Sequence, residues 1–289
     1  MSFIDVIIAI IYGIVEGISE WLPISSTGHM ILLDSFLNLH VSEAFHELYL
    51  VVIQLGAIMA VVVIYWKEIW PFGIKDNKHP WKKEGIGRWV KADKFNMWFK
   101  ILVACIPAII VGVLFDDYLD ELFYNYVCVS IMLILFGIAF IAVEKWVADK
   151  EPNVKSVDDI SYPQAFLIGA FQLIAAVFPG TSRSGSTIVG SLAMGISREA
   201  AAKFTFFLAI PVMMGASLLK IVKYEGEVTG AEIATLIIGM VVAFVVSWVV
   251  IKKFMAYIKK HSFTVFGWYR IAVGVLFLIL GILGLVTMS

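Results

Sequence analysis

The sequence predicts an all-α integral membrane protein with six transmembrane helices and two broken helices that form re-entrant hairpins. Composition is the first reason, because 61% of the residues are hydrophobic and 16% are charged, whereas soluble domains are about half apolar and a quarter charged. The second reason is a set of apolar runs of about 20 residues, the length that crosses a bilayer. The third is a polar cluster that contains a proline inside each of two further apolar runs.

Six apolar runs are long enough to span the membrane, and we expect one helix for each: about 48–66, 98–115, 123–143, 201–221, 231–251 and 265–287. Two other runs, about 6–37 and 164–196, are interrupted near Pro23 and Pro179. Irregular backbone persists at membrane depth only where protein or a water-filled cavity satisfies its polar groups. Each interrupted run is therefore predicted to be a re-entrant hairpin that lines a cavity.

The two interrupted runs resemble each other, which indicates an internal repeat. A shift of 156 positions aligns Ala9, Gly13, Ile18, Pro23 and Ser26 with Ala165, Gly169, Ile174, Pro179 and Ser182. The chain is then a single domain, 1–289, with repeats at about 1–143 and 160–289, each made of one hairpin and three spans. Because three crossings are an odd number, the second repeat enters from the opposite side. Inverted repeats of this kind place a binding site at the repeat interface, near the middle of the membrane.

Charge predicts the orientation, because cytoplasmic loops carry an excess of Lys and Arg. The basic residues gather in two loops on one side: Lys67, Lys75, Lys78, Lys82, Lys83, Arg88, Lys91 and Lys94 in 67–97, and Lys252, Lys253, Lys259 and Lys260 in 252–262. Both chain termini are expected outside, together with an acidic turn that contains Asp116, Asp117, Asp120 and Glu121. The net charge of -1 leaves no basic surplus for nucleic acid, and the two cysteines, inside apolar runs, suggest neither a disulfide nor a zinc site.

The first interrupted run contains two carboxylates, Glu16 and Glu20, which are four residues apart and share one face of a helix. Two unneutralised carboxylates at membrane depth are costly, so we expect a cation beside them. One candidate is a divalent metal, Mg²⁺ or Ca²⁺, which prefers hard oxygen ligands. The other is the guanidinium of Arg183, which would make a polar latch between the two hairpins.

Each interrupted run also has hydroxyl residues where a new helix is expected to begin, and free backbone N–H groups at a helix start bind anions. Ordinary helix capping needs one hydroxyl and explains neither Arg183 nor His29. The candidate anion-binding residues are Ser25, Ser26, Thr27 and Gly28 in the first hairpin, and Gly180, Thr181, Ser182, Arg183, Ser184 and Thr187 in the second. Gln54 and Gln172 are expected to line the cavity, and Arg270 to extend from the cytoplasmic end of the last span toward water.

A pyrophosphate site is predicted from three features together. They are the two opposed helix starts, the planar guanidinium of an arginine, and carboxylates that can bind a metal. Phosphoryl transfer further needs a nucleophile and a proton acceptor. Ser26 and His29 are three residues apart, close enough on a helix start for the imidazole to take a proton from the hydroxyl.

The chain resembles, over essentially its whole length, the bacitracin-resistance family of undecaprenyl-diphosphate phosphatases. The motifs that carry the resemblance are Glu16-x-x-x-Glu20, Pro23-x-Ser-Ser-Thr-Gly-His29, Val52-Ile-Gln-Leu-Gly56 and Pro179-Gly-Thr-Ser-Arg-Ser-Gly-Ser-Thr187. The resemblance implies removal of the terminal phosphate of undecaprenyl diphosphate, which yields the carrier lipid of peptidoglycan synthesis. It also implies a divalent metal, a location in the bacterial cytoplasmic membrane and a site that faces outward. The matched catalytic or metal-binding residues are Glu16, Glu20, Ser26, His29 and Arg183.

Several alternatives stay open at this point. Either Ser26 or His29 could attack phosphorus, with Ser26 as nucleophile and His29 as base the favoured arrangement. The competing class is a carrier that flips a polyprenyl phosphate, since inverted repeats with broken helices are typical of transporters. A carrier needs an anion site but no nucleophile. The sequence sets neither the preferred prenyl chain length nor whether chains associate as a homo-oligomer among the membrane lipids.

Overall fold

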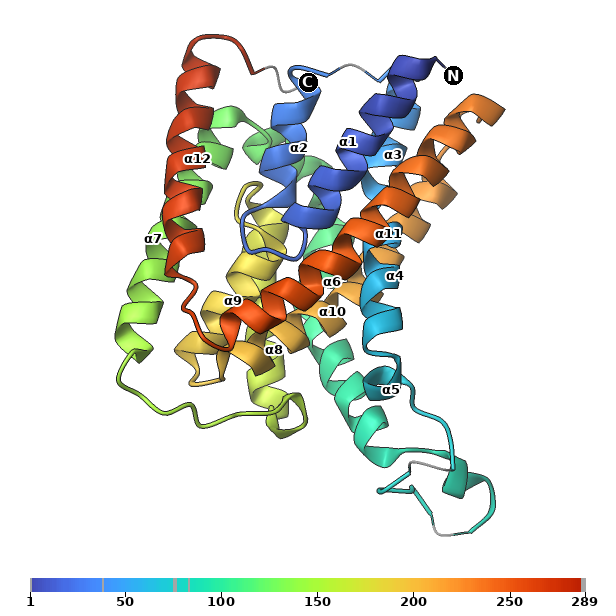
Figure 1. Ribbon diagram of the computed structural model, residues 1–289, viewed down its shortest axis with the longest axis vertical. Helices are drawn as coiled ribbons and strands as arrows, with labels where there is room; N and C mark the ends of the chain where they lie inside the picture. The colour runs from blue at the N-terminus through green and yellow to red at the C-terminus, as the bar shows by residue number, and fades with distance from the viewer. Residues whose placement is uncertain (1, 38, 75–76, 83, 287–289) are drawn as a thin grey trace.

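The computed structural model describes residues 2–37, 39–74, 77–82 and 84–286, and within them the regular structure is helical. Figure 1 shows a bundle with both chain termini at one end. Its α-helices are α1 (Phe3–Ser19), α2 (Ser26–Asp34), α3 (Glu43–Val52), α4 (Gln54–Ile64), α5 (Trp66–Ile69), α6 (Ala92–Phe123), α7 (Tyr126–Val147), α8 (Tyr162–Val177), α9 (Arg183–Ala193), α10 (Arg198–Lys223), α11 (Gly230–Ile258) and α12 (Thr264–Ile282).

Six helical segments are long and apolar enough to cross a membrane, which confirms the predicted number of spans. They are Glu43–Ile64, Ala92–Gly112, Tyr126–Val147, Arg198–Lys223, Gly230–Ile258 and Thr264–Ile282. The first combines α3 and α4, which follow each other with only Ile53 between them. An all-α integral membrane protein is therefore the fold class of this chain.

The end of α6 differs from the prediction. An acidic turn was expected from position 116 onward, but α6 stays helical to Phe123 and the connection to α7 is Tyr124 and Asn125. Asn125 fixes that point, because its side chain caps α7 by accepting a hydrogen bond from the Cys128 N–H. The side chains of Asp116, Asp117 and Asp120, and residues Lys75 and Lys83 of the basic loop, lie outside the described part of the structure.

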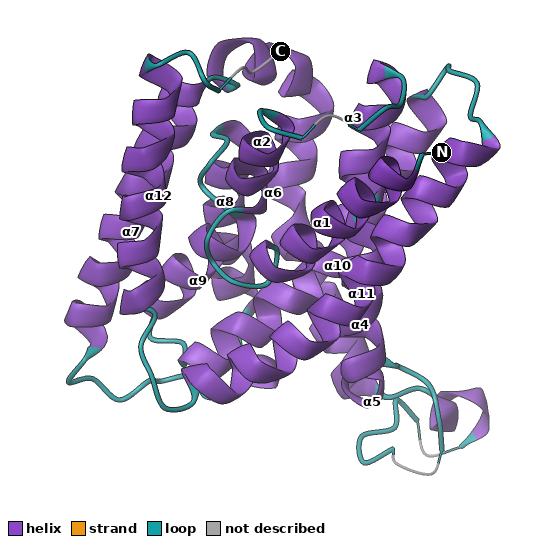
Figure 2. Ribbon diagram, turned by 45° about the horizontal axis from the view of Figure 1, so that its top comes forward, coloured by secondary structure: helices purple, strands orange, loops and turns teal. Residues whose placement is uncertain are grey.

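The two interrupted runs are helix–loop–helix hairpins, as Figures 1 and 2 show. Helices α1 and α2 are 17 and 9 residues long, and α8 and α9 are 16 and 11, so each is shorter than a membrane span. Pro23 and Pro179 lie in the loops, where proline's missing N–H and its ring prevent a continuous helix. The hydrogen bonds described below join the two loops inside the bundle.

The packing of the hairpins is compatible with an inverted repeat. Helix α1 lies along α11, the second span of the other half, and α8 lies along α6, the second span of the first half. Glycine permits both contacts: a Cβ at Gly13 would lie 2.6 Å from the Gly239 carbonyl oxygen, and one at Gly169 would lie 2.2 Å from that of Ala104. Gly13 and Gly169 are counterparts in the sequence alignment. The hairpin of each half therefore packs, through the same glycine position, against the second span of the other half.

The predicted orientation can be tested by cysteine labelling after Cys105 and Cys128 are replaced by alanine. Lys78 lies in the basic loop and Glu225 follows α10 at the opposite end, and both side chains are exposed. A cysteine at position 225 is expected to react with a membrane-impermeant thiol reagent in intact cells, and one at position 78 only after the cells are opened. The reverse pattern would invert the orientation.

Candidate active site

The two hairpins begin their second helices in the same unusual way. Ser25 and Ser182 have positive φ angles, 76° and 71°, and their hydroxyls accept hydrogen bonds from the N–H groups of Gly28 and Gly185. A positive φ is uncommon for a residue other than glycine, and these are the two such serines in the described part of the chain. The repetition of this conformation indicates a constraint that both hairpins share.

This geometry corrects the alignment of the repeats by one residue beyond the prolines. The sequence comparison paired Ser26 with Ser182, whereas the structure makes Ser25 the counterpart of Ser182. The second loop is one residue longer between its proline and its capping serine. Gly180 occupies this loop with a φ of +89°, and a Cβ there would lie 2.6 Å from the Val129 carbonyl oxygen. A residue with a side chain would therefore not fit at position 180.

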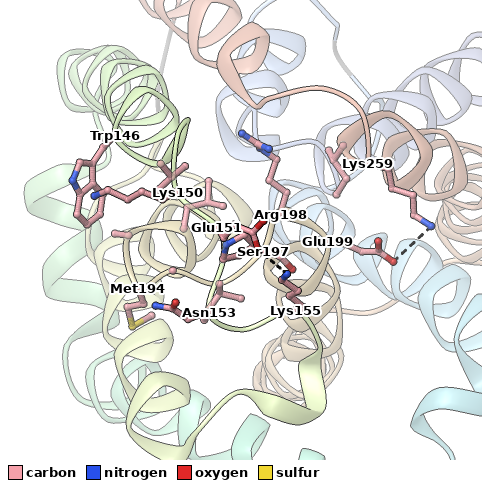
Figure 3. A pocket seen from close by; sticks show the side chains of 17 residues that line it. Trp146, Lys150, Glu151, Asn153, Lys155, Met194, Ser197, Arg198, Glu199 and Lys259 are labelled. Atoms are coloured by element: carbon pink, nitrogen blue, oxygen red, sulfur yellow. Dashed lines mark hydrogen bonds and ion pairs between the residues drawn. The ribbon is translucent and has the colours of Figure 1, made fainter.

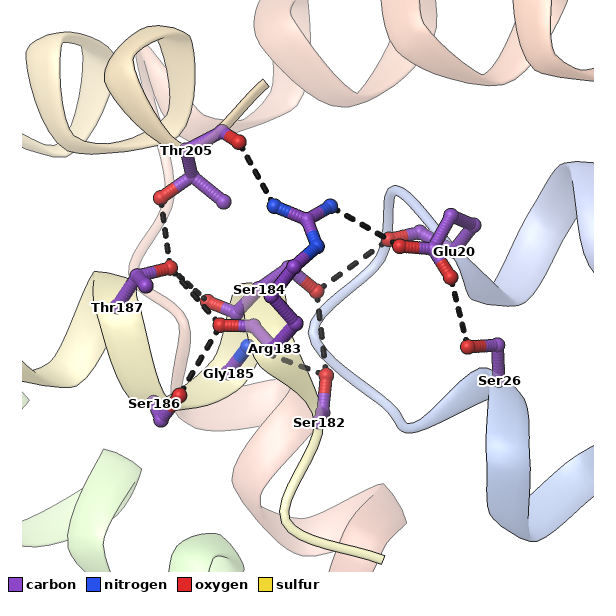
Figure 4. Close-up of polar contacts among 9 residues, drawn as sticks. All are labelled: Glu20, Ser26, Ser182, Arg183, Ser184, Gly185, Ser186, Thr187 and Thr205. Atoms are coloured by element: carbon purple, nitrogen blue, oxygen red, sulfur yellow. Dashed lines mark hydrogen bonds and ion pairs between the residues drawn. The ribbon is translucent and has the colours of Figure 1, made fainter. Parts of the chain in front are cut away.

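Arg183 joins the two hairpins through Glu20, as Figure 4 shows. Its Nη2 donates to Glu20 Oε1 at 3.0 Å, and its Nη1 donates to the Thr205 carbonyl oxygen at 2.9 Å. The side chains of Arg183 and Glu20 are 12% and 4% exposed. The predicted counter-ion for the carboxylate pair is therefore present, and within the pair it bonds to Glu20.

Ser26 uses the other oxygen of the same carboxylate. Its hydroxyl donates to Glu20 Oε2 at 2.7 Å. Glu20 is thus held by a guanidinium on one oxygen and faces a hydroxyl with the other, an arrangement in which the carboxylate can accept the serine proton. Ser26 belongs to the first turn of α2, at the positive end of that helix.

The prediction of a hydrogen bond between Ser26 and His29 is wrong, because each of these side chains has other partners. The Nδ1 atom of His29 lies 2.7 Å from the Ser25 carbonyl oxygen, and its Nε2 lies 2.7 Å from the Tyr269 hydroxyl. A carbonyl oxygen only accepts, so Nδ1 carries a proton and, in the neutral ring, Nε2 accepts from Tyr269. Both ring nitrogens are engaged, because the helix start directs the imidazole toward α12. No sequence signal pointed to Tyr269.

Glu16 is the open carboxylate of the site. It is 1% exposed, and its Oε1 atom has no hydrogen-bond partner. An orphaned, buried carboxylate oxygen fits a cation or a proton donor of the substrate. The described residues contain no cluster of three or more His, Cys, Asp or Glu side chains that could hold a metal ion. A metal at Glu16 would thus take most of its ligands from water and phosphate, as Mg²⁺ does.

A cavity of ≈ 590 Å³ lies beside these groups. It is lined at its base by Glu16, Ser26, Thr27 and Gln54, which were predicted for the site. The charged residues that line the rest come from four different helices: Asp34, Glu47, Glu121 and Lys220. Of these, the sequence pointed only to Glu121, as part of an acidic turn and not as a site residue.

The remaining predicted binding residues lie outside this lining, where they support the site. Ser184 is buried and donates to the Glu20 carbonyl oxygen at 3.3 Å, and the Thr187 hydroxyl lies 2.8 Å from that of Thr205. The Ser182 hydroxyl lies 3.2 Å from that of Ser184. Thr181 and Gln172 are buried with side-chain polar atoms that lack partners. The second hairpin therefore holds Glu20 and Arg183 in place from the side that does not line the cavity.

Arg270 corrects a further prediction, since it does not extend toward water. Its side chain is fully buried, and the guanidinium donates to the carbonyl oxygens of Pro23, Gly180 and Thr181 at 3.2, 2.9 and 2.8 Å. Each broken loop leaves carbonyl groups without helical partners, and a guanidinium offers five donors to satisfy them. Its position inside a span was a signal for this role, because ionisable residues at membrane depth are rarely without function.

Replacing Arg270 by methionine is expected to destabilise the protein, because three buried carbonyl groups would lose their donor at about 1–3 kcal/mol each. The melting temperature in detergent should fall clearly, and activity should be lost as the two loops separate. Arg88→Met, which removes an exposed arginine from the basic loop, is the matched control and should melt like the wild type. An unchanged melting temperature for Arg270→Met would contradict the assigned role.

A second cavity, of ≈ 630 Å³, lies at the other end of the bundle and is shown in Figure 3. None of the predicted catalytic residues lines it. Among its charged groups, Lys155 pairs with Glu151, Lys259 with Glu199 and Arg198 with Glu144, while Lys150 lies over the Trp146 ring. Of the predicted catalytic residues, Glu16 and Ser26 line the first cavity, and Glu20 is joined to it through Ser26.

The fold and the site define a polytopic membrane protein in which a partly buried serine and arginine flank a buried carboxylate between two broken helices, a class suited to a phosphorylated lipid. The chain belongs to the family described as Bacitracin resistance protein BacA, which matches residues 9–276. The resemblance noted in its motifs is thereby confirmed.

Individual relatives in that family carry a common name. The chain is 56% identical over 279 residues to an undecaprenyl-diphosphatase of Desulfitobacterium hafniense, covering 96% of this chain and 97% of the relative. It is 53% identical over 280 residues to an undecaprenyl-diphosphatase of Enterococcus faecalis, with 97% and 98% covered. An undecaprenyl-diphosphatase 1 of Clostridium acetobutylicum is 56% identical over 274 residues, with 95% and 96% covered.

Proposed function

We propose that this chain is a membrane hydrolase that converts undecaprenyl diphosphate to undecaprenyl phosphate and inorganic phosphate, and thereby recycles the carrier lipid of peptidoglycan synthesis. One observation carries the proposal: the Ser26 hydroxyl donates to Glu20, whose carboxylate is held by Arg183, at the wall of a cavity. The relatives named undecaprenyl-diphosphatase match nearly the whole chain, which supports the same substrate here.

In the proposed reaction the Ser26 oxygen attacks the terminal phosphorus while Glu20 accepts the hydroxyl proton. The bond between that phosphorus and the bridging oxygen breaks, and undecaprenyl phosphate leaves. Water then attacks the phosphoserine and releases inorganic phosphate, which restores the hydroxyl. Arg183 holds this carboxylate with its guanidinium, and it contacts the phosphate oxygens when they replace one of its present partners, Glu20 or the Thr205 carbonyl oxygen. His29 is a positioning residue, because it fixes the Ser25 carbonyl one residue before the nucleophile.

The proposed location is the bacterial cytoplasmic membrane, with the cavity open to the outer side. The cavity is lined by residues near the C-terminal ends of α2, α6 and α10, away from the lysine-rich loop at 67–97. A surplus of Lys and Arg marks the cytoplasmic side. In this proposal the headgroup of the lipid enters the cavity, while its prenyl chain stays in the membrane beside the apolar spans.

The proposal includes a divalent metal, Mg²⁺ or Ca²⁺, at Glu16 and Glu20. Glu16 has the free oxygen, while Glu20 reaches a cation only in exchange for Ser26 or Arg183. A bound ion would neutralise charge on the phosphate oxygens. The protein's own part is to offer buried, hard oxygen ligands that are kept apart from bulk water.

Excess EDTA is expected to abolish phosphate release, and Glu16→Gln is expected to lower it by about a hundredfold or more through loss of a charged ligand. Binding provides a second readout: Mg²⁺ should raise the melting temperature of the wild type and not that of Glu16→Gln. Glu225→Gln, at an exposed position outside the cavity, is the control and should behave like the wild type. Full activity in EDTA would exclude the metal and leave Arg183 as the counter-ion.

A further inference from the structure

The lining of the active-site cavity is strongly acidic for a pocket that is to admit a pyrophosphate. Glu16, Asp34, Glu47 and Glu121 line it, and within the described part of the chain Lys220 is its one basic side chain. A lipid diphosphate carries several negative charges, and their approach to like charges is unfavourable. Lys220 therefore carries the attraction that draws the headgroup into the cavity.

Arg183 cannot supply that attraction at the entrance. It does not line the cavity, and its Nη atoms are already bound to Glu20 and to the Thr205 carbonyl oxygen. Lys220, by contrast, lies in the last turn of α10, and its side chain is 39% exposed. An incoming phosphate meets Lys220 before it can reach Arg183.

Lys220 is held by Glu47, which competes with an incoming phosphate for its ammonium group. Its Nζ atom lies 2.7 Å from Glu47 Oε2 on α3, and the Glu47 side chain is 62% exposed. Ion pairs this accessible to water contribute little to stability, so the pair opens at small cost. A carboxylate and a phosphate oxygen offer the ammonium group the same kind of contact, and the phosphate brings the greater charge. The headgroup can thus replace Glu47 as the partner of Lys220.

We propose that Lys220 captures the pyrophosphate headgroup at the mouth of the cavity and that Glu47 sets the affinity by competing for the same ammonium group. The inference rests on the proposed function, since it assumes a lipid pyrophosphate as substrate. It assigns to Lys220 a binding role and leaves bond breaking to Ser26, Glu20 and Arg183.

Two variants of opposite charge test the proposal by steady-state kinetics with a prenyl diphosphate in mixed micelles. Lys220→Gln is expected to raise KM roughly tenfold, the lower end of the gain from electrostatic attraction, with kcat within about twofold of the wild type. It should also weaken the dependence of kcat/KM on ionic strength. Glu47→Gln should lower KM by about threefold, because a weak competing ion pair is removed. Lys220→Arg should retain a KM near that of the wild type.

The control is Lys223→Gln, which removes the same charge one turn away from an exposed lysine that does not line the cavity. Its KM should stay within about twofold of the wild-type value, since screening weakens exposed charges at a distance. A purely structural clasp between Glu47 and Lys220 predicts a different pattern, because both variants would then shift KM in the same direction and lower the melting temperature alike.

The outcomes separate the inference from the function on which it rests. If the wild type hydrolyses the prenyl diphosphate and the two variants shift KM in opposite directions, Lys220 is the capturing residue. If the wild type is active but the shifts have the same sign, or Lys220→Gln behaves like Lys223→Gln, the capture role is wrong and the hydrolase stands. If the wild type releases no phosphate at all, the proposed function itself fails.

Discussion

Ser26→Ala is expected to lower phosphate release from a prenyl diphosphate by at least about a hundredfold, the usual scale for loss of a nucleophile or general base. The structure gives the reason, because the Ser26 hydroxyl is the group that faces both Glu20 and the cavity. The variant should still bind the lipid pyrophosphate, since Arg183 and the N–H groups at the start of α2 remain. Phosphate release and lipid binding, measured on the same purified variant, should therefore separate.

His29→Ala provides the matched comparison for Ser26→Ala. We expect a fall of about a hundredfold here as well, the scale of a small misplacement of a reacting group, because the Ser25 carbonyl and α12 lose their common contact. The two variants differ in the intermediate. Trapping with labelled substrate should yield phosphoserine in His29→Ala and none in Ser26→Ala. A phosphohistidine in Ser26→Ala would make His29 the nucleophile and would contradict the assigned roles.

Arg183→Ala is expected to have an even larger effect, because it removes both turnover and binding. The guanidinium is 12% exposed and bonds to Glu20, and a charge-assisted contact of this kind in a buried site is among the stronger hydrogen bonds. Its loss also leaves Glu20 as an unpaired buried charge, a change that costs roughly 3–5 kcal/mol in other proteins. Phosphate release should fall below detection, and affinity for the lipid pyrophosphate should fall with it.

Arg183→Lys separates charge from geometry at this position. A lysine keeps the positive charge but cannot bridge Glu20 Oε1 and the Thr205 carbonyl oxygen with a planar fork. Compared with Arg183→Ala, we expect Arg183→Lys to have a higher melting temperature, though below that of the wild type, and a turnover that is hardly higher. Wild-type affinity in Arg183→Ala would show that the arginine is only a latch between the hairpins, which was the alternative weighed from the sequence.

The sequence was sufficient for the membrane architecture because its strongest signals are local. Apolar runs of spanning length gave the six spans, and Pro23 and Pro179 marked the interruptions, where the structure has loops. The odd number of spans in each half predicted that the second half is inverted, and the packing of α1 on α11 and of α8 on α6 is compatible with that prediction. The error at the end of α6 arose because acidic residues end a hydrophobic run without ending the helix.

The parts of the site that were missed depend on contacts between distant segments. A spacing of three suggested that Ser26 would bond to His29, but helix α12 provides Tyr269 as the partner of His29 and leaves Glu20 for Ser26. The one-residue error in the repeat alignment arose because the second loop has one more residue between its proline and its capping serine than the first loop. Arg270 is the one charged residue of α12 and Lys220 is one of two lysines in the last turn of α10, and only the fold shows what each of them faces.

The measurement that tests the account most directly is the release of inorganic phosphate from C55 prenyl diphosphate by the purified, detergent-solubilised protein. The account predicts turnover by the wild type and a loss of at least about a hundredfold in Ser26→Ala. The competing class, a carrier, is examined with the same two proteins in liposomes that contain prenyl phosphate. If the wild type releases no phosphate from any prenyl diphosphate, yet it and Ser26→Ala move prenyl phosphate across the bilayer equally well, the hydrolase account is wrong.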